Sequence, residues 1–445
     1  MIHFQTKPIE EKRAIMKPAE LPDNPRIGVI GLGYVGLPLA CLFSKAYPVA
    51  GYDIDREKVS SLYNGNDSKE QCDNAAFEAA IERGITFTAS SSDLRECNVF
   101  IISVPTPVGE DLLPDFKPLL EASELVGSVM KRGDVVIYES TVNPGATEEI
   151  CVPALEKASL MKFNHDFYVG YSPERVNPGN SAHSIENICK ITSGSTPATA
   201  EFVDRLYNSV LEAGTCPVSS IKVAEAAKIL ENTQRDVNIA LMNEAAILFD
   251  ALGIDTHEVI EAASTKWNFA HYTPGLVGGH CIGIDPYYLI NKARECGIDP
   301  IVMKAARQRN EGMATHIVSR IRRAMKSKNI PVKDARILLA GFSFKADCND
   351  TRNTKIYDIY NELSDFTASI DIFDPNVDQA SVLKSHAIKI CTEWHEISGK
   401  KYDAVIFCVA HSAFSKYDIK SLMAHPCATF DIMGILNRPE VDDRL

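Results

Sequence analysis

The feature that most constrains this chain is a glycine-rich turn between two short apolar runs near the N-terminus. Residues 26–30 (RIGVI) are expected to form a buried strand, followed by the turn at residues 31–36 (GLGYVG) and a helical pattern over residues 37–45. A second apolar run at residues 49–52 ends at Asp53. Strand, glycine turn, helix, strand and acid in this order predict a dinucleotide-binding βαβ unit.

Each glycine of this turn has its own physical reason. Gly31 permits the tight turn, Gly33 lets the backbone approach a pyrophosphate, and Gly36 lets helix and strand pack closely. The pyrophosphate is expected against the N–H groups at the positive end of the helix dipole. Asp53 favours NAD over NADP, because an acid pairs with free ribose hydroxyls. The alternative is a glycine turn that serves packing alone. Tyr34 and Val35, which lie between Gly33 and Gly36, are also predicted to contact NAD.

Composition argues against several classes of protein. The formal net charge is −13 and no long basic run is present, which argues against nucleic-acid binding. No segment approaches 18 consecutive apolar residues, so we expect no membrane span. Residues 1–25 are expected to form an N-terminal arm, since they lack the apolar core of a secretory signal. The twelve cysteines show no metal-ligand spacing, which predicts reduced thiols, a cytoplasmic location and no metal site.

Apolar runs alternate with helical patterns through the first half of the chain. Runs at 99–104, 135–138, 167–171 and 189–193 indicate further strands of one parallel sheet, within a domain at residues 26–218. Ligands bind such sheets beyond the carboxyl ends of the strands. The residues at these positions are turn residues, caps or functional groups: Pro105, Thr106, Pro107, Glu139, Ser140, Thr141, Ser172, Pro173, Glu174 and Arg175.

After residue 219 the pattern becomes helical. Residues 221–252 have apolar side chains at helical spacing and no internal proline or glycine, which predicts a single helix roughly 45 Å long. We expect this helix to organise a central helical domain at residues 219–328 and to form a homodimer face. A further helical segment is predicted at about residues 300–326.

A second alternation of strand and helix patterns begins near residue 329. It predicts a smaller α/β domain at residues 329–445, with the run 341–345 (GFSFK) at the end of its first strand. The predicted fold class is therefore α/β, with two Rossmann-like domains of doubly wound parallel sheets joined by a central helical domain.

A glycine-bracketed cysteine gives the chain a candidate nucleophile. Residues 278–286 (GGHCIGIDP) place Cys281 between glycines and four residues before Asp285. A buried, inert cysteine is the alternative interpretation. Lys228 and Asn232 are four residues apart on the predicted long helix and so share one face. They are either a solvated pair or a partly buried ammonium and amide with a chemical role.

A dinucleotide site combined with a thiol predicts oxidation through a covalent intermediate. An alcohol dehydrogenase needs only a base, whereas a thiol becomes useful when an aldehyde must be carried on to an acid. Thiolate attack gives a thiohemiacetal, whose oxidation gives a thioester that water cleaves. Lys228 and Asn232 are candidates to stabilise the developing oxyanions, and Glu174 and Asp285 to activate water.

Taken together, these motifs resemble the UDP-glucose/GDP-mannose dehydrogenase family. Enzymes of that family oxidise the C6 hydroxyl of a nucleotide sugar to a carboxylate with two NAD. Residues 267–269 and 279–288 most resemble the branch that acts on UDP-GlcNAc and UDP-GalNAc for capsule, Vi-type or O-antigen synthesis in bacteria. The resemblance runs from about Arg26 to the end of the chain, through residues 31–36, 140–141, 172–175, Lys228 with Asn232, 278–285, 341–345 and 350–352.

The resemblance implies a role for each matching residue. Cys281 would be the nucleophile, Lys228 and Asn232 would stabilise oxyanions, and Glu174 and Asp285 would assist proton transfer and thioester hydrolysis. Thr141 would position water. Cofactor contacts would further include Thr106, Thr141 and Arg352, and contacts to a UDP-sugar substrate would come from Glu174, Arg175, Lys228, Asn232, Tyr272, Gly278 and Lys345.

Two alternatives stay open. One keeps the mechanism but takes UDP-glucose, UDP-ManNAc or GDP-mannose. The other is a catalytically silent nucleotide-sensing protein on the same fold, against which the joint presence of Cys281, Lys228 and Asn232 argues. The chain also departs from the family near Asp431, where Met433 and Gly434 replace a basic residue common in relatives, so a charge contact from that turn is in doubt.

Overall fold

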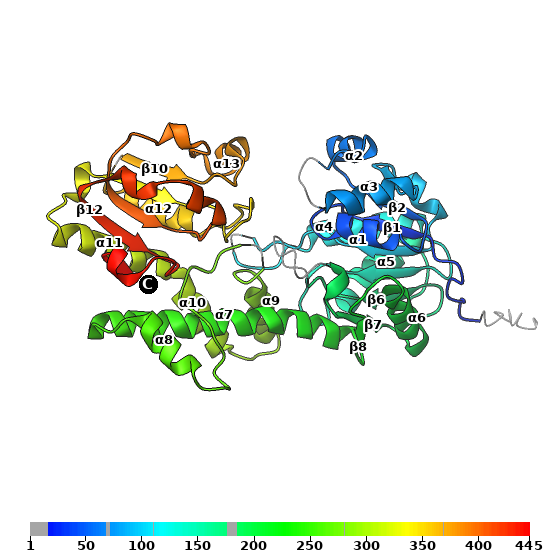
Figure 1. The fold of residues 1–445 in the computed structure, drawn as a ribbon. Helices are drawn as coiled ribbons and strands as arrows, with labels where there is room; N and C mark the ends of the chain where they lie inside the picture. Colours follow the sequence, from blue (N-terminus) through cyan, green and yellow to red (C-terminus); the bar gives the residue numbers. More distant parts are fainter. Residues whose placement is uncertain (1–16, 68–71, 110, 176–184, 280, 368) are drawn as a thin grey trace, which may run out of the picture.

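The computed structural model describes residues 17–67, 72–109, 111–175, 185–279, 281–367 and 369–445. Two α/β units lie at opposite ends of the molecule, and one long helix runs along both of them (Figure 1). The predicted N-terminal arm falls largely on residues 1–16, which lie outside the described residues. Its described end is attached to the first unit, because Ala19 donates to the His165 carbonyl and accepts from the Tyr168 hydroxyl.

The first unit is built on an eight-stranded sheet in the order β3-β2-β1-β4-β5-β6-β7-β8. The predicted parallel sheet is confirmed, except that β6 and β7 run antiparallel. A parallel pair needs a crossover connection, whereas the described residues between β6 and β7 form only a short 3-10 helix, Ile185–Asn187. The strands are β1 (Ile27–Ile30), β2 (Val49–Tyr52), β3 (Thr86–Thr88), β4 (Val99–Ile102), β5 (Val135–Tyr138), β6 (Tyr168–Tyr171), β7 (Lys190–Gly194) and β8 (Thr215–Pro217).

Helices cover both faces of this sheet, which gives it two separate hydrophobic cores. α1 (Gly36–Phe43), α3 (Asn74–Glu82) and α6 (Pro197–Asn208) pack on one face. α4 (Lys117–Val129) and α5 (Val152–Ser159) pack on the other. The strand order reverses between β1 and β4, so the carboxyl ends of these strands border a crevice suited to a ligand.

The second unit repeats this plan on a smaller scale. Its five strands are all parallel, in the order β10-β9-β11-β12-β13. α12 (Ile356–Ser364) and α13 (Gln379–His386) contribute to the core on one face. The strands are β9 (Arg336–Ala340), β10 (Ser369–Phe373), β11 (Tyr402–Phe407), β12 (Met423–Asp431) and β13 (Asp443–Arg444).

The long helix α7 (Ile221–Leu252) has the bounds expected from the sequence. It begins where the Ser220 side chain accepts from the Val223 N–H and ends at Gly253, which adopts the left-handed conformation with φ +71°. Among the described residues, no helix combines the length and the apolar character needed to cross a membrane. The remaining helices away from the second sheet are α2 (Arg56–Tyr63), α8 (Thr256–Ser264), α9 (Asp285–Glu295) and α10 (Ile301–Glu311).

The helical segment expected at residues 300–326 is divided into two helices. α10 packs on α7, whereas α11 (Met313–Ser327) packs its apolar face on the second sheet together with α12. Gly312 separates them. A glycine inside a helical pattern weakens the helix, and here it marks the point at which the chain leaves the central helices for the second unit.

Candidate active site

A cleft of about 1570 Å³ lies between the two units. The carboxyl ends of β1, β2, β4 and β5 line one side, α7 and the cysteine loop line its base, and loops of the second unit line the other side. Of the residues predicted for the site, those that line this cleft are Gly31, Gly33, Tyr34, Val35, Asp53, Thr106, Thr141, Glu174, Arg175, Lys228, Asn232, Gly278, Cys281, Asp285 and Arg352. The structure therefore brings most of the predicted set together, while their individual roles stay predictions.

Three predicted residues do not line the cleft. Gly36 lies beneath the glycine turn, and the Tyr272 hydroxyl is hydrogen-bonded to the side chain of Gln234 on α7 at 3.2 Å. Lys345 follows Phe344, which lines the cleft, and its ammonium lies 5.4 Å from the centre of that ring. Burial lowers the pKa of Lys345, and the nearby side chains of Cys348 and Cys281 oppose that shift.

The glycine turn has the geometry that a bound pyrophosphate requires. Gly31 has φ +90°, a conformation that favours glycine. A Cβ at Gly36 would lie 1.8 Å from the Gly31 carbonyl oxygen, so helix and turn can approach this closely only with glycine. Open space surrounds Gly33, where a Cβ would meet nothing within 4 Å. The exposed face of the turn is thus accessible to a dinucleotide at the start of α1.

Asp53 completes the dinucleotide end of the cleft. One carboxylate oxygen accepts from the Leu32 N–H at 2.9 Å and from Lys58 Nζ at 2.8 Å. Although burial opposes the shift, these donors hold the pKa of Asp53 below its ordinary value, so the group is an anion at neutral pH. The turn and this acid are the groups that a dinucleotide needs for its pyrophosphate and ribose. Lys58 was not predicted from the sequence, although it lies in the first turn of α2, five residues after Asp53.

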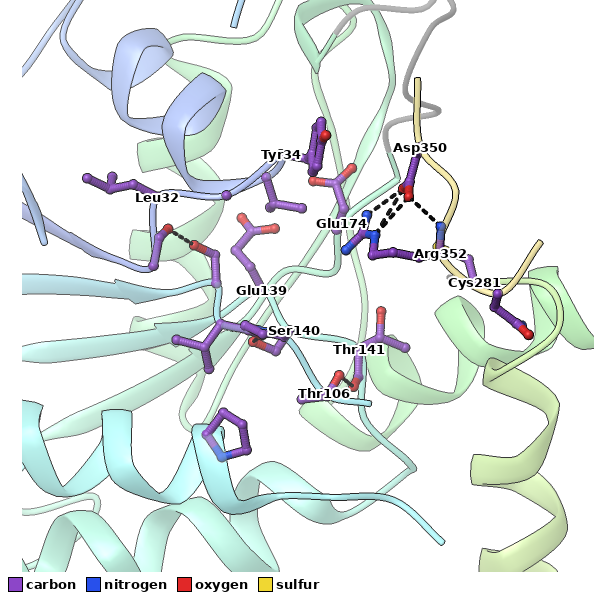
Figure 2. A pocket seen from close by; sticks show the side chains of 18 of the residues that line it. Leu32, Tyr34, Thr106, Glu139, Ser140, Thr141, Glu174, Cys281, Asp350 and Arg352 are labelled. Carbon is purple, nitrogen blue, oxygen red and sulfur yellow. Dashed lines mark hydrogen bonds and ion pairs between the residues drawn. The ribbon is translucent and has the colours of Figure 1, made fainter. Parts of the chain in front are cut away.

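The cysteine loop lies at the other end of the cleft. Cys281 is exposed to the cleft, whereas His280 of the same motif lies outside the described residues. Desolvation within the cleft and the Asp285 carboxylate raise the pKa of the Cys281 thiol to about 11, and the Lys228 ammonium opposes this rise. Figure 2 shows Cys281 beyond the Asp350–Arg352 pair, on the opposite side from Glu174. The thiol is therefore accessible but needs a proton acceptor before it can act as a nucleophile.

Lys228, Asn232 and Asp285 form a buried group next to this thiol. Lys228 and Asn232 are 7% and 6% exposed, so they form a buried ammonium and amide and not a solvated pair. The Asn232 amide donates to the Asp285 carboxylate at 2.5 Å. Desolvation raises the pKa of Asp285 to about 6, against the opposing effects of Lys228 and Asn232. A carboxyl group with this pKa is mostly ionised at pH 7 but takes up a proton more readily than an ordinary aspartate, which suits it to proton transfer.

A buried ion pair supports the segment that carries Glu174. The Lys190 ammonium lies 2.6 Å from the Glu139 carboxylate and also donates to the Pro173 carbonyl at 2.9 Å. Burial raises the pKa of Glu139 to about 7, although Lys190 opposes this. Lys190 thus fixes the backbone next to Glu174. The sequence pointed to Glu139 only as one of several strand-end residues, and no sequence motif pointed to Lys190.

The second unit contributes a loop that the sequence identified only in part. Arg352 is bound to Asp350, and its guanidinium lies 5.4 Å from the ring centre of Tyr34 in the glycine turn (Figure 2). The next residue, Asn353, also lines the cleft and contacts the cysteine loop. The sequence feature that could have identified Asn353 is its position directly after the motif at residues 350–352. The cleft extends further along the second unit past the end of β10, where sequence reasoning named no residue: Asn376, Val377, Asp378, Ser381, Val382, Ser385 and His386.

The pKa of Cys281 leads to a prediction about its reactivity. Alkylation by iodoacetamide, followed by mass spectrometry of the Cys281 peptide, should be slow at pH 7 and rise about tenfold per pH unit until it levels off near the thiol pKa. Asp285→Asn removes a negative charge that raises this pKa, so alkylation of that variant should be faster between about pH 7 and 10, where Asp285 is ionised in the wild type. Equal rates at pH 8 would show that Asp285 does not act on the thiol.

Comparison with known proteins identifies all three parts of the chain. Residues 25–211 match the NAD binding domain of the UDP-glucose/GDP-mannose dehydrogenase family, residues 222–312 its central domain and residues 338–438 its UDP binding domain. The chain is 49% identical to a UDP-N-acetyl-D-glucosamine 6-dehydrogenase of Pseudomonas aeruginosa, covering 94% of this chain and 99% of the relative. It is 46% identical to the enzyme of the same name from Salmonella typhi, covering 95% and 99%.

A solved structure supports the same assignment. The UDP-D-ManNAc dehydrogenase of Pyrococcus horikoshii superposes with a TM-score of 0.85 at 31% identity, over 94% of this chain and 98% of that one. All three domains of the family match in order, and the match covers these relatives almost completely. The cleft also combines the dinucleotide turn with a thiol. The chain belongs to the UDP-glucose/GDP-mannose dehydrogenase family and is an NAD-dependent oxidoreductase.

Proposed function

We propose that this enzyme oxidises the C6 hydroxyl of a UDP-N-acetylhexosamine, UDP-GlcNAc or UDP-GalNAc, to the carboxylate, as a step in surface polysaccharide synthesis. The observation that carries the proposal is the position of Cys281, accessible in the cleft beside buried Lys228, Asn232 and Asp285. The similarity to two UDP-N-acetyl-D-glucosamine 6-dehydrogenases supports UDP-GlcNAc as the substrate.

The proposed reaction removes two hydrides from the same carbon. NAD, when bound at the glycine turn and Asp53, accepts one hydride in each of the two oxidations. Between them, the Cys281 sulfur bonds to the aldehyde carbon, and the carbonyl π electrons move to oxygen to give a thiohemiacetal. The second oxidation leaves a thioester. Water then adds to its carbonyl and the carbon–sulfur bond breaks, which releases the acid and restores the thiol. Overall, one alcohol and one water give one carboxylate, two hydrides and three protons.

The residues around Cys281 suit the charges that develop in this sequence. A cation and an amide donor favour the oxyanions of addition and hydrolysis, and Lys228 and the second N–H of Asn232 supply them. Asp285, with its pKa near 6, is suited to take the thiol proton and to return one to the leaving sulfur. Glu174, held by the Lys190 contact to Pro173, is the second carboxylate for water activation, with Thr141 to position the water.

The proposal is tested by turnover of purified sugar nucleotides with NAD. UDP-GlcNAc, UDP-GalNAc, UDP-glucose, UDP-ManNAc and GDP-mannose are compared by NADH absorbance, and the acid product is quantified by chromatography. We expect UDP-GlcNAc or UDP-GalNAc to give the highest kcat/KM and two NADH per acid, and a preference for UDP-ManNAc would favour that alternative substrate. A clear preference for UDP-glucose would contradict the acetamido assignment. No oxidation of any of the five would favour the nucleotide-sensing alternative.

We also propose a homodimer through α7. Five large apolar residues of this helix are 45% to 61% exposed. Their spacings of 7, 11, 7 and 4 residues keep them within about 20° of one line along the helix at 3.6 residues per turn. A continuous apolar row of this kind marks an interface, and a two-fold contact pairs it with its own copy. The row consists of Val223, Leu230, Leu241, Leu248 and Leu252.

The dimer is tested by placing charge in this row. The double substitution Leu230→Glu with Leu241→Glu should shift the mass measured by analytical ultracentrifugation from dimer to monomer, because four carboxylates would face one another across the interface. Leu160→Glu is the control, since Leu160 is 92% exposed but lies outside α7. A dimer that persists in the double variant would place the contact elsewhere.

We place the enzyme in the cytoplasm, where nucleotide sugars and NAD are available. All twelve cysteines are free thiols in the structure, and several are buried, which suits a reducing compartment. Fractionation of cells with detection of the protein in the cytosolic fraction tests this placement.

A further inference from the structure

One loop of the second unit touches both reactive ends of the cleft. It comprises residues 350–353, between β9 and α12. Arg352, bound to Asp350, lies over the Tyr34 ring of the glycine turn. Asp350 also accepts, through its carbonyl, from the Phe344 N–H at 3.1 Å, which ties the loop to the first strand end of the second unit. We call residues 350–353 the bridging loop.

The bridging loop is joined to the cysteine loop through Asn353. The Gly279 N–H donates to the Asn353 carbonyl at 3.1 Å, and the Asn353 side-chain amide donates to the Gly279 carbonyl at 3.0 Å. Both backbone groups of Gly279 are therefore held by one residue. Gly279 lies two positions before Cys281, so this pair of hydrogen bonds fixes the backbone that leads into the nucleophile.

The glycines of the cysteine loop permit this close approach. A Cβ at Gly278 would lie 2.6 Å from the Asn353 carbonyl oxygen, and a Cβ at Gly279 would lie 2.6 Å from the Phe344 ring. Neither contact would tolerate a side chain. The two glycines that marked the motif in the sequence thus serve packing against the second unit, which holds the cysteine loop in place.

We propose that Asn353 is a positioning residue that sets the Cys281 thiol against the nucleotide-sugar side of the cleft, so that occupancy of the second unit determines the reactivity of the thiol. Asn353 acts through Gly279 and the bridging loop. The inference rests on the proposed covalent mechanism, and it adds that the segment before Cys281 is held by the second unit, while the Cys281 carbonyl accepts from the Ile284 and Asp285 N–H groups at the start of α9. The second unit matches the UDP binding domain of the family.

Asparagine has the two properties that position 353 requires. The residue has φ +52°, in the left-handed region, which asparagine and glycine adopt more readily than other residues. Its side chain must also donate to a carbonyl, which aspartate and glycine cannot do. Asn353→Gly therefore keeps the backbone conformation and removes only the side-chain bond. Asn353→Asp keeps size and conformation but places a carboxylate against the Gly279 carbonyl.

The first test compares these variants with Asn329→Gly. Asn329 also has a left-handed φ, +58°, but lies between α11 and β9, outside the cleft lining. We expect Asn353→Gly and Asn353→Asp to lower kcat by about 10- to 100-fold with little change in KM, because a small displacement of a nucleophile costs this much. More of the aldehyde intermediate should be trapped by hydroxylamine. Asn329→Gly should match the wild type in both measurements.

The second test measures coupling without turnover. Iodoacetamide alkylation of Cys281 is followed with and without UDP, the nucleotide part of the proposed substrate. UDP should change the alkylation rate of the wild type and of Asn329→Gly, and should have much less effect on Asn353→Gly. Should Asn353→Gly fail to fold, as judged by its Tm, Asn353→Asp carries both comparisons.

The outcomes separate this inference from the proposed function. Wild-type kcat and wild-type aldehyde release in both Asn353 variants would overturn the positioning role while leaving the dehydrogenase intact. An equal response to UDP in wild type and Asn353→Gly would also overturn it. Absence of turnover in the wild type with every nucleotide sugar would refute the proposed function, and the alkylation comparison would still decide the coupling.

Discussion

Replacing Cys281 by serine should lower steady-state acid formation by at least about 10³-fold, the scale of loss seen when a catalytic nucleophile is removed. A serine hydroxyl ionises far less readily than a thiol, so the corresponding hemiacetal and ester would form too slowly to support turnover. Binding of NAD and of the sugar nucleotide should be retained, because the glycine turn and Asp53 lie at the other end of the cleft. Turnover is measured by NADH absorbance and acid by chromatography, with binding by calorimetry.

Cys216→Ser provides the control for this experiment. Cys216 is an exposed thiol on β8, away from the cleft. It should show wild-type kcat and KM. Mass spectrometry of the wild-type enzyme under turnover should in addition find the sugar nucleotide attached to the Cys281 peptide. Undiminished turnover in Cys281→Ser, with no adduct in the wild type, would make the thiol a bystander.

Replacing Lys228 by alanine should lower kcat by about 10²- to 10³-fold, as loss of one oxyanion stabiliser does, and should change KM little. The Lys228 ammonium is buried and lowers the pKa of both Cys281 and Asp285. It acts on negative charge that develops during the reaction, which favours the transition state over the bound substrate. Removal should also slow alkylation of Cys281 at fixed pH, since the pKa of the thiol would rise further.

Lys222→Ala is a matched control, because Lys222 lies on the same helix but is exposed and pairs with Glu149 on the surface. We expect wild-type kinetics from it. A Lys228→Ala variant that raised KM without lowering kcat would show that the ammonium binds substrate and transition state equally, which would contradict its assigned role.

The sequence predicted those parts of the fold that depend on local signals. The bounds of α7 follow from helical spacing, a serine cap and a terminal glycine, all of which are read within a few residues. The glycine turn and Asp53 were predicted because the βαβ unit places its functional residues at fixed local distances. The antiparallel β6–β7 pair was missed, since strand direction depends on the path of the connection.

Contacts between distant segments account for what the sequence left undetermined. Asn353 and Gly279 are 74 residues apart, and only the folded arrangement of the two units brings them together. The burial of Lys228 and the Lys190–Glu139 pair are of the same kind. Tyr272 shows the converse: it lies near the cysteine loop in the chain, but its hydroxyl is directed to Gln234 on α7 and not into the cleft.

The attachment of the cysteine loop to the second unit bears on how one enzyme completes two oxidations without losing its half-finished product. Spent nicotinamide must leave and a fresh molecule must enter while the sugar waits on sulfur. Gly279 is bonded to Asn353 of the second unit and Asp285 to Asn232 on α7, whereas the glycine turn belongs to the opposite wall. The backbone that carries the nucleophile therefore has attachments independent of the glycine turn, so exchange of nicotinamide at that turn can leave sulfur and sugar in place.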